Sequence, residues 1–460
     1  MSNTLLALAA LAAVPCLTAQ TKLAGGPFVV NAGQRSATVV WIVETGRGSL
    51  GTAPDKLDTI GVALHAQKLL FTGLTPGTTQ YYSVTGTEEG KGSFKTAPRD
   101  ETPFQFVVYG DTRTRHDVHR QVIAAILKQS SPDFVVQTGD MVANGADTSL
   151  WPIFFDIERE LLSKAAFFPV LGNHERNDRN FYEFFDVAAT PYYSFNWGSC
   201  HFSMLDSDIN NVGKTESARQ AFWNEQVRWL EEDLQKSQSA RFRFVVAHHP
   251  PMTAVAHRQG DNPHMTALMP LLEKYKVTAG LFGHDHNYQH YLRNGVHYFI
   301  TGGGGAPLYD VDKPPQEITR KVASTENFLV VDVNGKSLRV RALTPTGETL
   351  ETTGLGTQRS SARSVYPIPR TVCRSCRSSP TAIRARNARM KTYSVASLTP
   401  PSPPQPASAS TFLGTMEPAR RISVSSSAYS VRVSATARGP RCSSCVRAFS
   451  RRSSNSRSGG

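Results

Sequence analysis

Hydrophobic residues along the chain fall into two successive patterns, followed by a long stretch with neither. Between residues 24 and 98, short runs of alternating apolar and polar residues are separated by Gly, Pro and Asp turns, which predicts a small all-β domain. The run at residues 69–86, a turn followed by an aromatic strand, favours a small β-sandwich. Residues 98–103 then have the composition of a linker.

Residues 104–345 alternate short apolar strands with helical patterns, which predicts layers of strands and helices. Strands are expected at residues 106–109, 134–136, 167–171, 242–247 and 278–282, and helices at residues 117–129, 216–236 and 265–275. The stretches 194–206, 297–301 and 328–342 look antiparallel, the last with an Asn334-Gly335 hairpin. The predicted fold class is therefore α/β, with two mixed sheets packed as a sandwich and flanked by helices.

Residues 358–460 are rich in Ser, Arg, Pro and Ala and show no sustained apolar periodicity, so we predict a disordered tail. This tail holds 18 Lys and Arg and one acidic residue, Glu417. It therefore accounts for all of the chain's net charge of +13 and leaves the remainder at −4. Because the basic character belongs to the tail alone, and the tail lacks interleaved aromatic residues, no nucleic-acid partner is expected.

The N-terminus holds a short apolar run, residues 5–13, before Pro15 and small residues. This length suits the core of a signal peptide over residues 1–19 and is too short to cross a bilayer, although no Lys or Arg precedes it. A buried N-terminal segment is the alternative. We expect a secreted or periplasmic protein without a membrane span. The pairs Cys373/Cys376 and Cys442/Cys445 lie too far apart for a zinc ribbon.

Five short polar motifs follow the predicted strands of the α/β region. They are Gly110-Asp111, Gly139-Asp140, Gly172-Asn173-His174-Glu175, His248-His249-Pro250 and Gly283-His284-Asp285-His286. In open α/β sheets, ligands bind just beyond the carboxyl ends of the strands, so these motifs are expected at one rim. A lone Gly-Asp is a common turn; it is the ordered set of five that points to a site.

Asp and His offer the oxygen and nitrogen ligands that divalent transition metals accept. His284 and His286 are two residues apart, so on an extended segment both point the same way and can reach different ions. Two ions about 3.5–4 Å apart can clamp a phosphate and activate a hydroxide for in-line attack. The motifs therefore predict a binuclear centre, with iron, manganese or zinc as the candidate metals.

The ordered motifs resemble those of the calcineurin-like metallophosphoesterases. The preceding β-domain, which is similar to a fibronectin type III domain, and the Phe-Lys-Thr-Ala-Pro hinge at residues 94–98 resemble the purple acid phosphatases. The resemblance implies that Asp111 and His286 bind the first metal and that Asp140 bridges both. It implies that Asn173, His248 and His284 bind the second. His174 would protonate the leaving oxygen or hold the phosphate, and Glu175 would orient a histidine from behind.

The chain departs from these families at the first metal. Purple acid phosphatases have a Tyr where this chain has Ala143, and many relatives have a His where it has Arg113. Purple colour is therefore not expected. His116 or His119 could fill the gap, although a solvated histidine at a helix end is slightly favoured for each. Arg113 is a candidate contact for the substrate phosphate. His257, nine residues after His248, corresponds to a substrate-facing histidine or is a plain surface residue.

The resemblance implies hydrolysis of a small phosphate ester, in the manner of an acid phosphatase acting on monoesters. Two alternatives stay open. A phosphodiesterase would use the same metal clamp, and a degenerate, non-catalytic binding protein would follow from a first metal site too weak to work. Gly302–Gly305 could cradle phosphate, but a tight turn is the more ordinary explanation.

Overall fold

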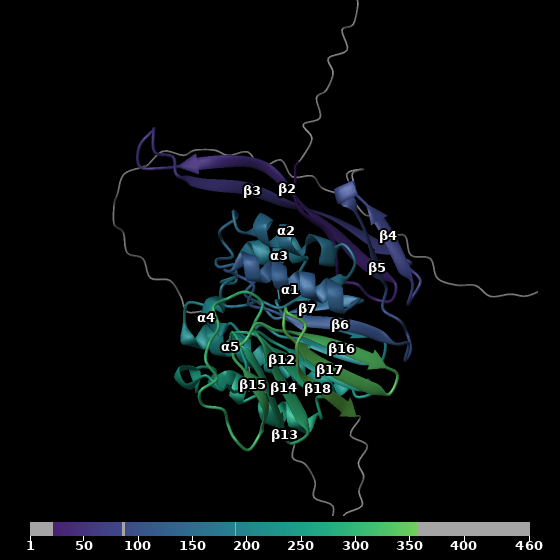
Figure 1. Cartoon of the computed structure of the whole chain (residues 1–460). Coiled ribbons are helices and arrows are strands. Elements are labelled where there is room, and N and C mark those ends of the chain that lie inside the picture. Colours follow the sequence, from purple (N-terminus) through teal and green to yellow (C-terminus); the bar gives the residue numbers. More distant parts are fainter. Residues whose placement is uncertain (1–21, 85–87, 189, 357–460) are drawn as a thin grey trace, which may run out of the picture. The chain divides into compact units, whose positions relative to one another are not determined.

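Two large β-sheets packed face to face form the centre of the protein. The computed structural model describes residues 22–84, 88–188 and 190–356, and Figure 1 shows the sheets with their helices. The predicted signal peptide (residues 1–19) and the predicted tail (residues 358–460), with its two cysteine pairs, lie outside the described residues. Within the described part, no helix is long and apolar enough to cross a membrane.

The first sheet has nine strands in the order β18-β17-β16-β6-β7-β8-β1-β2-β3. Its strands are β1 (Lys22–Val30), β2 (Ser36–Leu50), β3 (Thr59–Thr72), β6 (Phe104–Tyr109), β7 (Phe134–Gln137), β8 (Ala166–Pro169), β16 (Phe328–Asn334), β17 (Ser337–Leu343) and β18 (Thr349–Gly356). The central strands β6, β7 and β8 are parallel, and Phe106 pairs with Phe134. Strands β16 and β17 form the expected hairpin around Asn334-Gly335, with Gly335 in the left-handed region.

The second sheet has seven strands in the order β15-β13-β14-β12-β11-β10-β9. Its strands are β9 (Tyr193–Trp197), β10 (Cys200–Met204), β11 (Phe242–Val246), β12 (Ala279–Phe282), β13 (Tyr288–Arg293), β14 (Val296–Thr301) and β15 (Thr319–Ala323). Strands β10, β11, β12 and β14 are parallel. Both sheets therefore contain a block of parallel strands, which lets the loops at their carboxyl ends meet.

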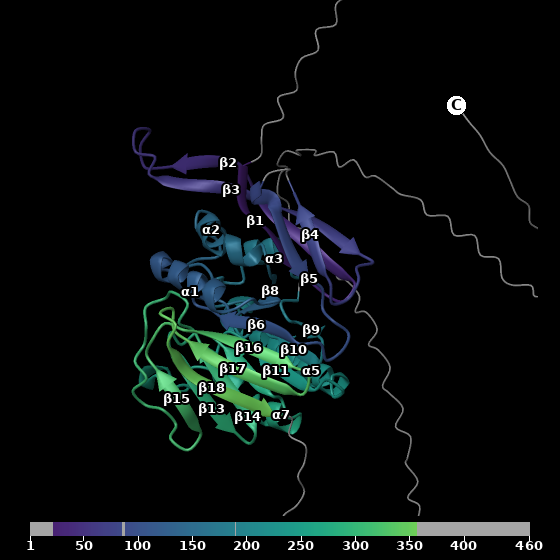
Figure 2. The same ribbon diagram turned by 45° about the vertical axis from the view of Figure 1, so that its right-hand side comes forward.

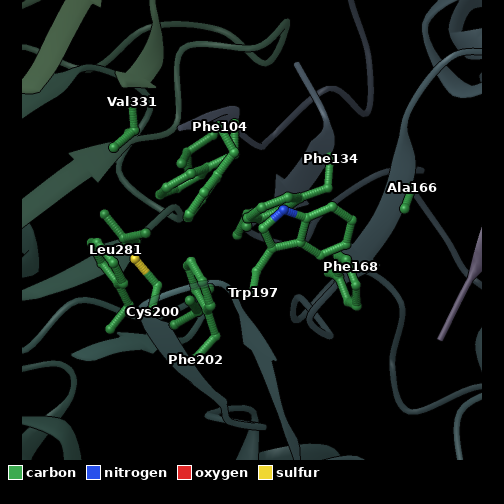
Figure 3. Packing of buried hydrophobic residues seen from close by; sticks show 14 of the residues in the cluster. Phe104, Phe134, Ala166, Phe168, Trp197, Cys200, Phe202, Leu281 and Val331 are labelled. Carbon is green, nitrogen blue, oxygen red and sulfur yellow. The ribbon is translucent and has the colours of Figure 1, made fainter. Parts of the chain in front are cut away.

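An aromatic core fills the space between the two sheets. Phe106 and Phe134 of the first sheet stack at 4.9 Å, and the ring of Phe202 from the second sheet meets Phe106 edge-on at 5.3 Å. Trp197 lies 4.6 Å from Phe134, and Figure 3 shows this packing with Phe168 and Leu281 beside it. Burying each such side chain contributes about 1.5–3 kcal/mol. The strand patterns thus place their alternate apolar faces in one shared core.

Helices cover the outer faces of both sheets. The first sheet carries α1 (His116–Gln129), α2 (Trp151–Leu162) and α3 (Arg179–Phe185), and the second carries α5 (Glu216–Lys236), α6 (Pro263–Thr266) and α7 (Met269–Lys274). The short elements η1 (Glu88–Gly90), α4 (Ile209–Val212) and η2 (Ala256–Arg258) lie in loops. The predicted α/β fold class, two sheets flanked by helices, is confirmed; Figure 2 gives a second view of these layers.

The predicted small all-β domain at residues 24–98 is all-β, but it is not a separate unit. Strand β1 joins the large sheet through a parallel bridge between Val29 and Ala166, and β2 and β3 extend that sheet. One face of this extension packs on α2 and α3, where Phe28 stacks on Phe155 at 5.4 Å. The other face packs on the hairpin of β4 (Thr79–Ser83) and β5 (Lys91–Lys95). The strands therefore bury part of their apolar surface against the helices of the following region, and the likeness of this segment to a fibronectin type III sandwich stays a prediction.

Three further features of the fold differ from those expected from the sequence: a divided helix, a C-terminal boundary and an additional helix. The expected helix at residues 265–275 is two short helices, because Pro270 has no N–H to donate to the preceding turn. The compact region expected to end at residue 345 continues through β18 to Gly356. Helix α2 was missed, although Trp151, Phe154 and Phe155 begin a buried stripe at helical spacing.

Candidate metal centre

The residues predicted to bind metal or substrate follow the carboxyl ends of five parallel strands. Asp111 follows β6, Asp140 follows β7, Asn173 and His174 follow β8, His248 follows β11, and His284 and His286 follow β12. Contacts join the two sheets here, since Asn173 Oδ1 lies 3.0 Å from His248 Nε2 and the backbone N–H of His284 donates to Asp111 at 2.9 Å. The structure thus gathers the predicted ligands at one edge of the double sheet.

The backbone at this edge adopts conformations that L-residues rarely take. Asp111, Asp140 and His284 have φ angles of 59°, 57° and 68°. Such a conformation costs on the order of 1–3 kcal/mol per residue and is typical of functional sites. Glycine precedes each of them, and a Cβ on Gly283 would lie 2.5 Å from Asp111 Oδ2. The glycine in the Gly-Asp and Gly-His motifs therefore allows two segments of the backbone to approach closely at the site.

Asn173, His248 and His284 form a group that we call the histidine-rich cluster. Asn173 Oδ1 lies 3.0 Å from His248 Nε2 and 3.1 Å from His284 Nδ1, and those two nitrogens lie 3.2 Å apart. Neighbouring ligands of an ion with bonds of about 2.1 Å lie about 3 Å apart. These donor atoms therefore have the mutual spacing that one metal ion requires.

Asp111, Asp140 and His286 form a second group, the carboxylate cluster. Asp111 is fully buried, and its Oδ1 has no hydrogen-bond partner among the described residues, with His286 Nε2 3.5 Å away. Asp140 Oδ1 lies 3.5 Å from His248 Nε2 and so links the two clusters. A buried carboxylate oxygen without a partner is costly unless a cation faces it, so this group too fits a metal ion.

Backbone carbonyls behind the site fix two of the histidine rings. His248 Nδ1 lies 2.8 Å from the carbonyl of Thr138, and His286 Nδ1 lies 2.6 Å from the carbonyl of Pro307. Each Nδ1 must therefore carry the proton and donate it, which leaves the lone pair on Nε2. In both residues Nε2 faces the clusters, and this is the arrangement that metal-binding histidines adopt.

Burial keeps the imidazole rings of the site neutral, which is the form that binds a metal ion. It lowers the pKa of His248 to about 3 and that of His286 to about 4, and it holds the pKa of His284 well below its ordinary value. Burial and the negative charge of Asp140 raise the pKa of Asp111 well above its usual range. The imidazoles are thus neutral, and the two carboxylates repel each other in a way that a cation relieves.

Glu175 has a different role from the predicted one of orienting a histidine. Its buried carboxylate accepts hydrogen bonds from the backbone N–H groups of Asp140 at 2.9 Å, Met141 at 2.8 Å and Gly172 at 2.8 Å. Burial, followed by the charge of Asp140, raises its pKa to about 8. The prediction is corrected: Glu175 holds the two loops that carry Asp140 and Asn173.

His174 lies at the open side of the centre, consistent with a contact to substrate. Its Nδ1 lies 2.9 Å from the carbonyl of Ala143, and its Nε2 lies 3.9 Å from Asp140 Oδ2. The side chain is 28% exposed, whereas Asp140 is buried. Asp208, which the sequence reasoning missed, lies close enough for the charges of Asp140 and His174 to act on its carboxyl; burial raises its pKa to about 6. Its position just after β10, another parallel strand, was the available signal.

His249 is a second residue whose place was missed, although its motif was identified. Its ring centroid lies 4.2 Å from that of His284, and a ligand atom of its ring lies within 4.8 Å of donor atoms of His248 and His284. Its Nδ1 lies 2.9 Å from Ser207 Oγ, which also accepts the backbone N–H of His249. His249 therefore adds a nitrogen donor beside the histidine-rich cluster.

Arg113 points at the carboxylate cluster. Its Nε lies 3.4 Å from Asp140 Oδ2 and has no hydrogen-bond partner in the described part of the chain. The side chain is only 15% exposed. A cationic side chain therefore lies beside Asp140 in the carboxylate cluster.

His257 lies on η2 and is exposed, and its predicted role as a substrate-facing histidine stays a prediction. Its ring meets the edge of Tyr309 at 5.8 Å, and Tyr309 in turn stacks on His286 at 4.4 Å. The neighbouring Arg258 donates a hydrogen bond to the Tyr309 hydroxyl at 2.9 Å and lies 3.5 Å from Asp285. His257 thus reaches the centre only through the ring of Tyr309.

The other candidates for the first metal do not join the cluster. His119 Nε2 is bonded to the buried Glu158 at 2.7 Å, on the helical side of the sheet, which argues against a ligand role. His116 is not among the groups of closely spaced donors in the described residues. The run Gly302–Gly305 packs on the Asp111 loop, where Gly304 donates to the carbonyl of Gly110 at 3.0 Å. The tight-turn reading of that run is favoured.

Comparisons with known proteins agree with this geometry. Residues 104–288 match the family described as Calcineurin-like phosphoesterase. The chain is similar to tartrate-resistant acid phosphatase type 5 of Homo sapiens, with 34% identity over 28% of this chain and 42% of that protein. It is 27% identical to an uncharacterized protein of Mycobacterium tuberculosis over 49% of this chain and 51% of the relative.

Among solved structures, the fold resembles a purple acid phosphatase from yellow lupin (Lupinus luteus) seeds. The TM-score is 0.56, with 16% sequence identity over 72% of this chain and 74% of the lupin protein. At that identity the likeness concerns the fold alone. The chain also spans only about half the length of the Mycobacterium tuberculosis relative. The matched family and the two donor groups together indicate a binuclear metal site.

Proposed function

We propose that the protein hydrolyses small phosphate esters at a binuclear metal centre, as a phosphomonoesterase of acid phosphatase type. The observation that carries this proposal is the position of Asp140. Its carboxylate lies within 3.5 Å of the donor nitrogen of His248 in the histidine-rich cluster and also belongs to the carboxylate cluster. One carboxylate shared by two sets of donors is what a pair of ions requires.

Each ion has its own set of residues under this proposal. Asp111, Asp140 and His286 hold the first, while Asp140, Asn173, His248 and His284 hold the second, with iron, manganese or zinc suited to such oxygen and nitrogen donors. When bound, the ions supply Lewis acidity to a phosphate oxygen and lower the pKa of a water molecule. Glu175 and the carbonyls of Thr138 and Pro307 keep these ligands oriented.

His174 is the proposed proton donor to the leaving oxygen. Hydrogen-bond geometry places the proton on Nδ1, against the carbonyl of Ala143, and leaves Nε2 on the open side. Protonation of Nε2 gives an imidazolium that can hold the phosphate and release a proton to the departing alkoxide. Such general acid help is typically worth about 10²–10⁴ in rate. Arg113, beside Asp140, is placed to attract the phosphate dianion.

A cavity lies beside the loops that carry His249 and His284, although no residue of the two clusters lines it. This cavity of about 310 Å³ is lined by Pro250, Met252, Thr253, Arg258 and Asp285. Pro250 follows His249 in the chain, and Asp285 lies between His284 and His286. Export from the cell remains a prediction from the apolar run at residues 5–13.

The test is hydrolysis by the full chain of an aryl phosphate monoester and of an aryl phosphodiester, each with added manganese, zinc or iron. Faster turnover of the monoester, abolished by a chelator, supports the proposal. Faster turnover of the diester would replace it with a phosphodiesterase. Absence of turnover on both esters with every metal would leave a degenerate binding protein.

A further inference from the structure

The two donor clusters differ in the charge that the protein itself places beside them. The histidine-rich cluster is made of neutral donors, and His249 adds a further nitrogen next to it. The carboxylate cluster has three donors, Asp111, Asp140 and His286, and a guanidinium faces it. This asymmetry concerns the same site as the proposed function and rests on that function for its metals.

Arg113 is fixed against the carboxylate cluster. Its Nε forms an ion pair with Asp140 Oδ2 at 3.4 Å, and the side chain is largely buried. This nitrogen has no hydrogen-bond partner in residues 22–84, 88–188 and 190–356. Its charge also acts on Asp111 and His286. The guanidinium therefore interacts with every member of this cluster.

A guanidinium cannot give up its proton in the physiological range, so its charge is permanent. A permanent cation beside two carboxylates does part of what a metal ion does there, since it offsets their mutual repulsion. It also repels an incoming metal cation, because both are positively charged. It cannot bind the ion either, because it offers no lone pair. The donors of the histidine-rich cluster are an amide oxygen and neutral imidazoles. Among the described residues, the guanidinium whose charge acts on these imidazoles is that of Arg258, which is paired with Asp285 at 3.5 Å and not with a donor of the cluster.

We propose that the two clusters hold metal ions unequally, and that Arg113 is the cause. The histidine-rich cluster retains its ion, while the carboxylate cluster exchanges its ion readily and is filled only in excess metal. Arg113 is a positioning residue here: it holds Asp140 through charge and supplies positive potential to the carboxylate cluster when that cluster's ion is absent.

The test is a metal count on the full chain, independent of turnover. Chelator-treated protein is incubated with excess Zn²⁺ or Mn²⁺, desalted, and its bound metal measured by mass spectrometry; a titration then gives the two dissociation constants. We expect one ion per chain after desalting and a second site at least about 30-fold weaker. Arg113→Ala and Arg113→His are expected to retain closer to two ions. Arg113→Lys, which keeps the charge, should behave like the unaltered protein.

Arg120→Ala is the matched control, because it removes an exposed arginine on α1, the helix that follows the Arg113 loop, and this arginine is paired with Asp156 on the surface. It should leave the metal count unchanged. Two ions retained equally by the unaltered protein, or no gain of metal in Arg113→Ala and Arg113→His, would overturn the inference. Neither result would touch the proposed function, which fails instead if saturating metal gives no hydrolysis.

Discussion

Buried histidines occur in two kinds of setting in this protein, at the rim and between the sheets. At the rim, His248 and His286 each donate a hydrogen bond from Nδ1 to a backbone carbonyl. The other ring nitrogen, Nε2, faces oxygen atoms of the clusters that have no hydrogen to donate to it. Between the sheets, His290 lies 3.0 Å from Glu351 through one nitrogen and 2.9 Å from His297 through the other. The second network is complete in itself, whereas the first needs a cation.

The comparison shows that burial of a histidine does not by itself mark a metal site. His201 and His119 are likewise buried, and they bond to Asp233 at 2.8 Å and Glu158 at 2.7 Å. What distinguishes the rim is a set of acceptor atoms directed at one another, which is unfavourable until a positive ion joins them. Substitutions at the rim should therefore affect activity, and those between the sheets should affect stability.

The largest effect is expected at the carboxylate shared by both clusters. Asp140→Asn removes the charge that links them, so kcat for an aryl phosphate should fall about 10³-fold or more and bound metal should drop. Turnover and metal content are measured on the same preparation. Asp156→Asn, an exposed carboxylate on α2, is the control and should change neither. Normal turnover in Asp140→Asn would break the assignment of the rim as the reactive centre.

His174→Ala should reduce kcat by about 10²–10⁴ while bound metal stays at the unaltered level, because His174 belongs to neither cluster. The loss should be smaller for a substrate with a good leaving group, such as a nitrophenyl ester, than for an alkyl phosphate. An equal loss for both esters would contradict its role as proton donor.

Glu175→Ala leaves four backbone N–H groups, those of Asp140, Met141, Val142 and Gly172, without their acceptor. We expect metal affinity to fall about 10–100-fold, as when other residues behind metal ligands are removed, and the melting temperature to drop. Excess metal should restore part of the activity. If metal affinity is unchanged in a folded variant, Glu175 does not hold the two loops as described.

The histidine network between the sheets predicts a pH dependence of the free energy of unfolding, which is separate from any pH dependence of activity. Burial, followed by the charge of His290, lowers the pKa of His297 to about 4. In the unfolded chain this histidine takes up a proton near pH 6.5, whereas in the folded protein it does so only near pH 4. The contribution of His297 to the free energy of unfolding is therefore fully present above about pH 6.5 and declines as pH falls from about 6.5 to 4. His297→Asn should flatten this decline by at most about 2 kcal/mol after allowance for solvent screening, measured by denaturant unfolding at several pH values. Equal pH slopes in the two proteins would contradict it.

The smallest effect is expected for His257→Ala. The ring is exposed and contacts the centre only through Tyr309. We expect less than about a threefold change in kcat/KM, as for other surface residues without a direct contact. A loss of tenfold or more would support the prediction of a substrate-facing histidine.

The sequence predicted the rim well because each ligand is tied to a local pattern. Strand, glycine and polar residue recur at Asp111, Asp140, Asn173 and His284, and the long helix α5 matched its expected bounds from Glu216 to Lys236. Residues whose roles depend on contacts with distant segments of the chain were harder to predict. The bonds of Glu175 to two loops, the packing of β1 on α2 and the closeness of Asp208 to His174 all depend on segments far apart in the chain.

The most direct test of the account is to follow hydrolysis and metal content together. Chelator-treated full chain is titrated with Mn²⁺ or Zn²⁺, and aryl phosphate turnover is recorded against ions bound per chain. The account predicts no turnover without metal and maximal turnover as occupancy reaches two. Turnover that persists after complete metal removal, or its absence with two ions bound and every ester tested, would contradict a binuclear phosphoesterase.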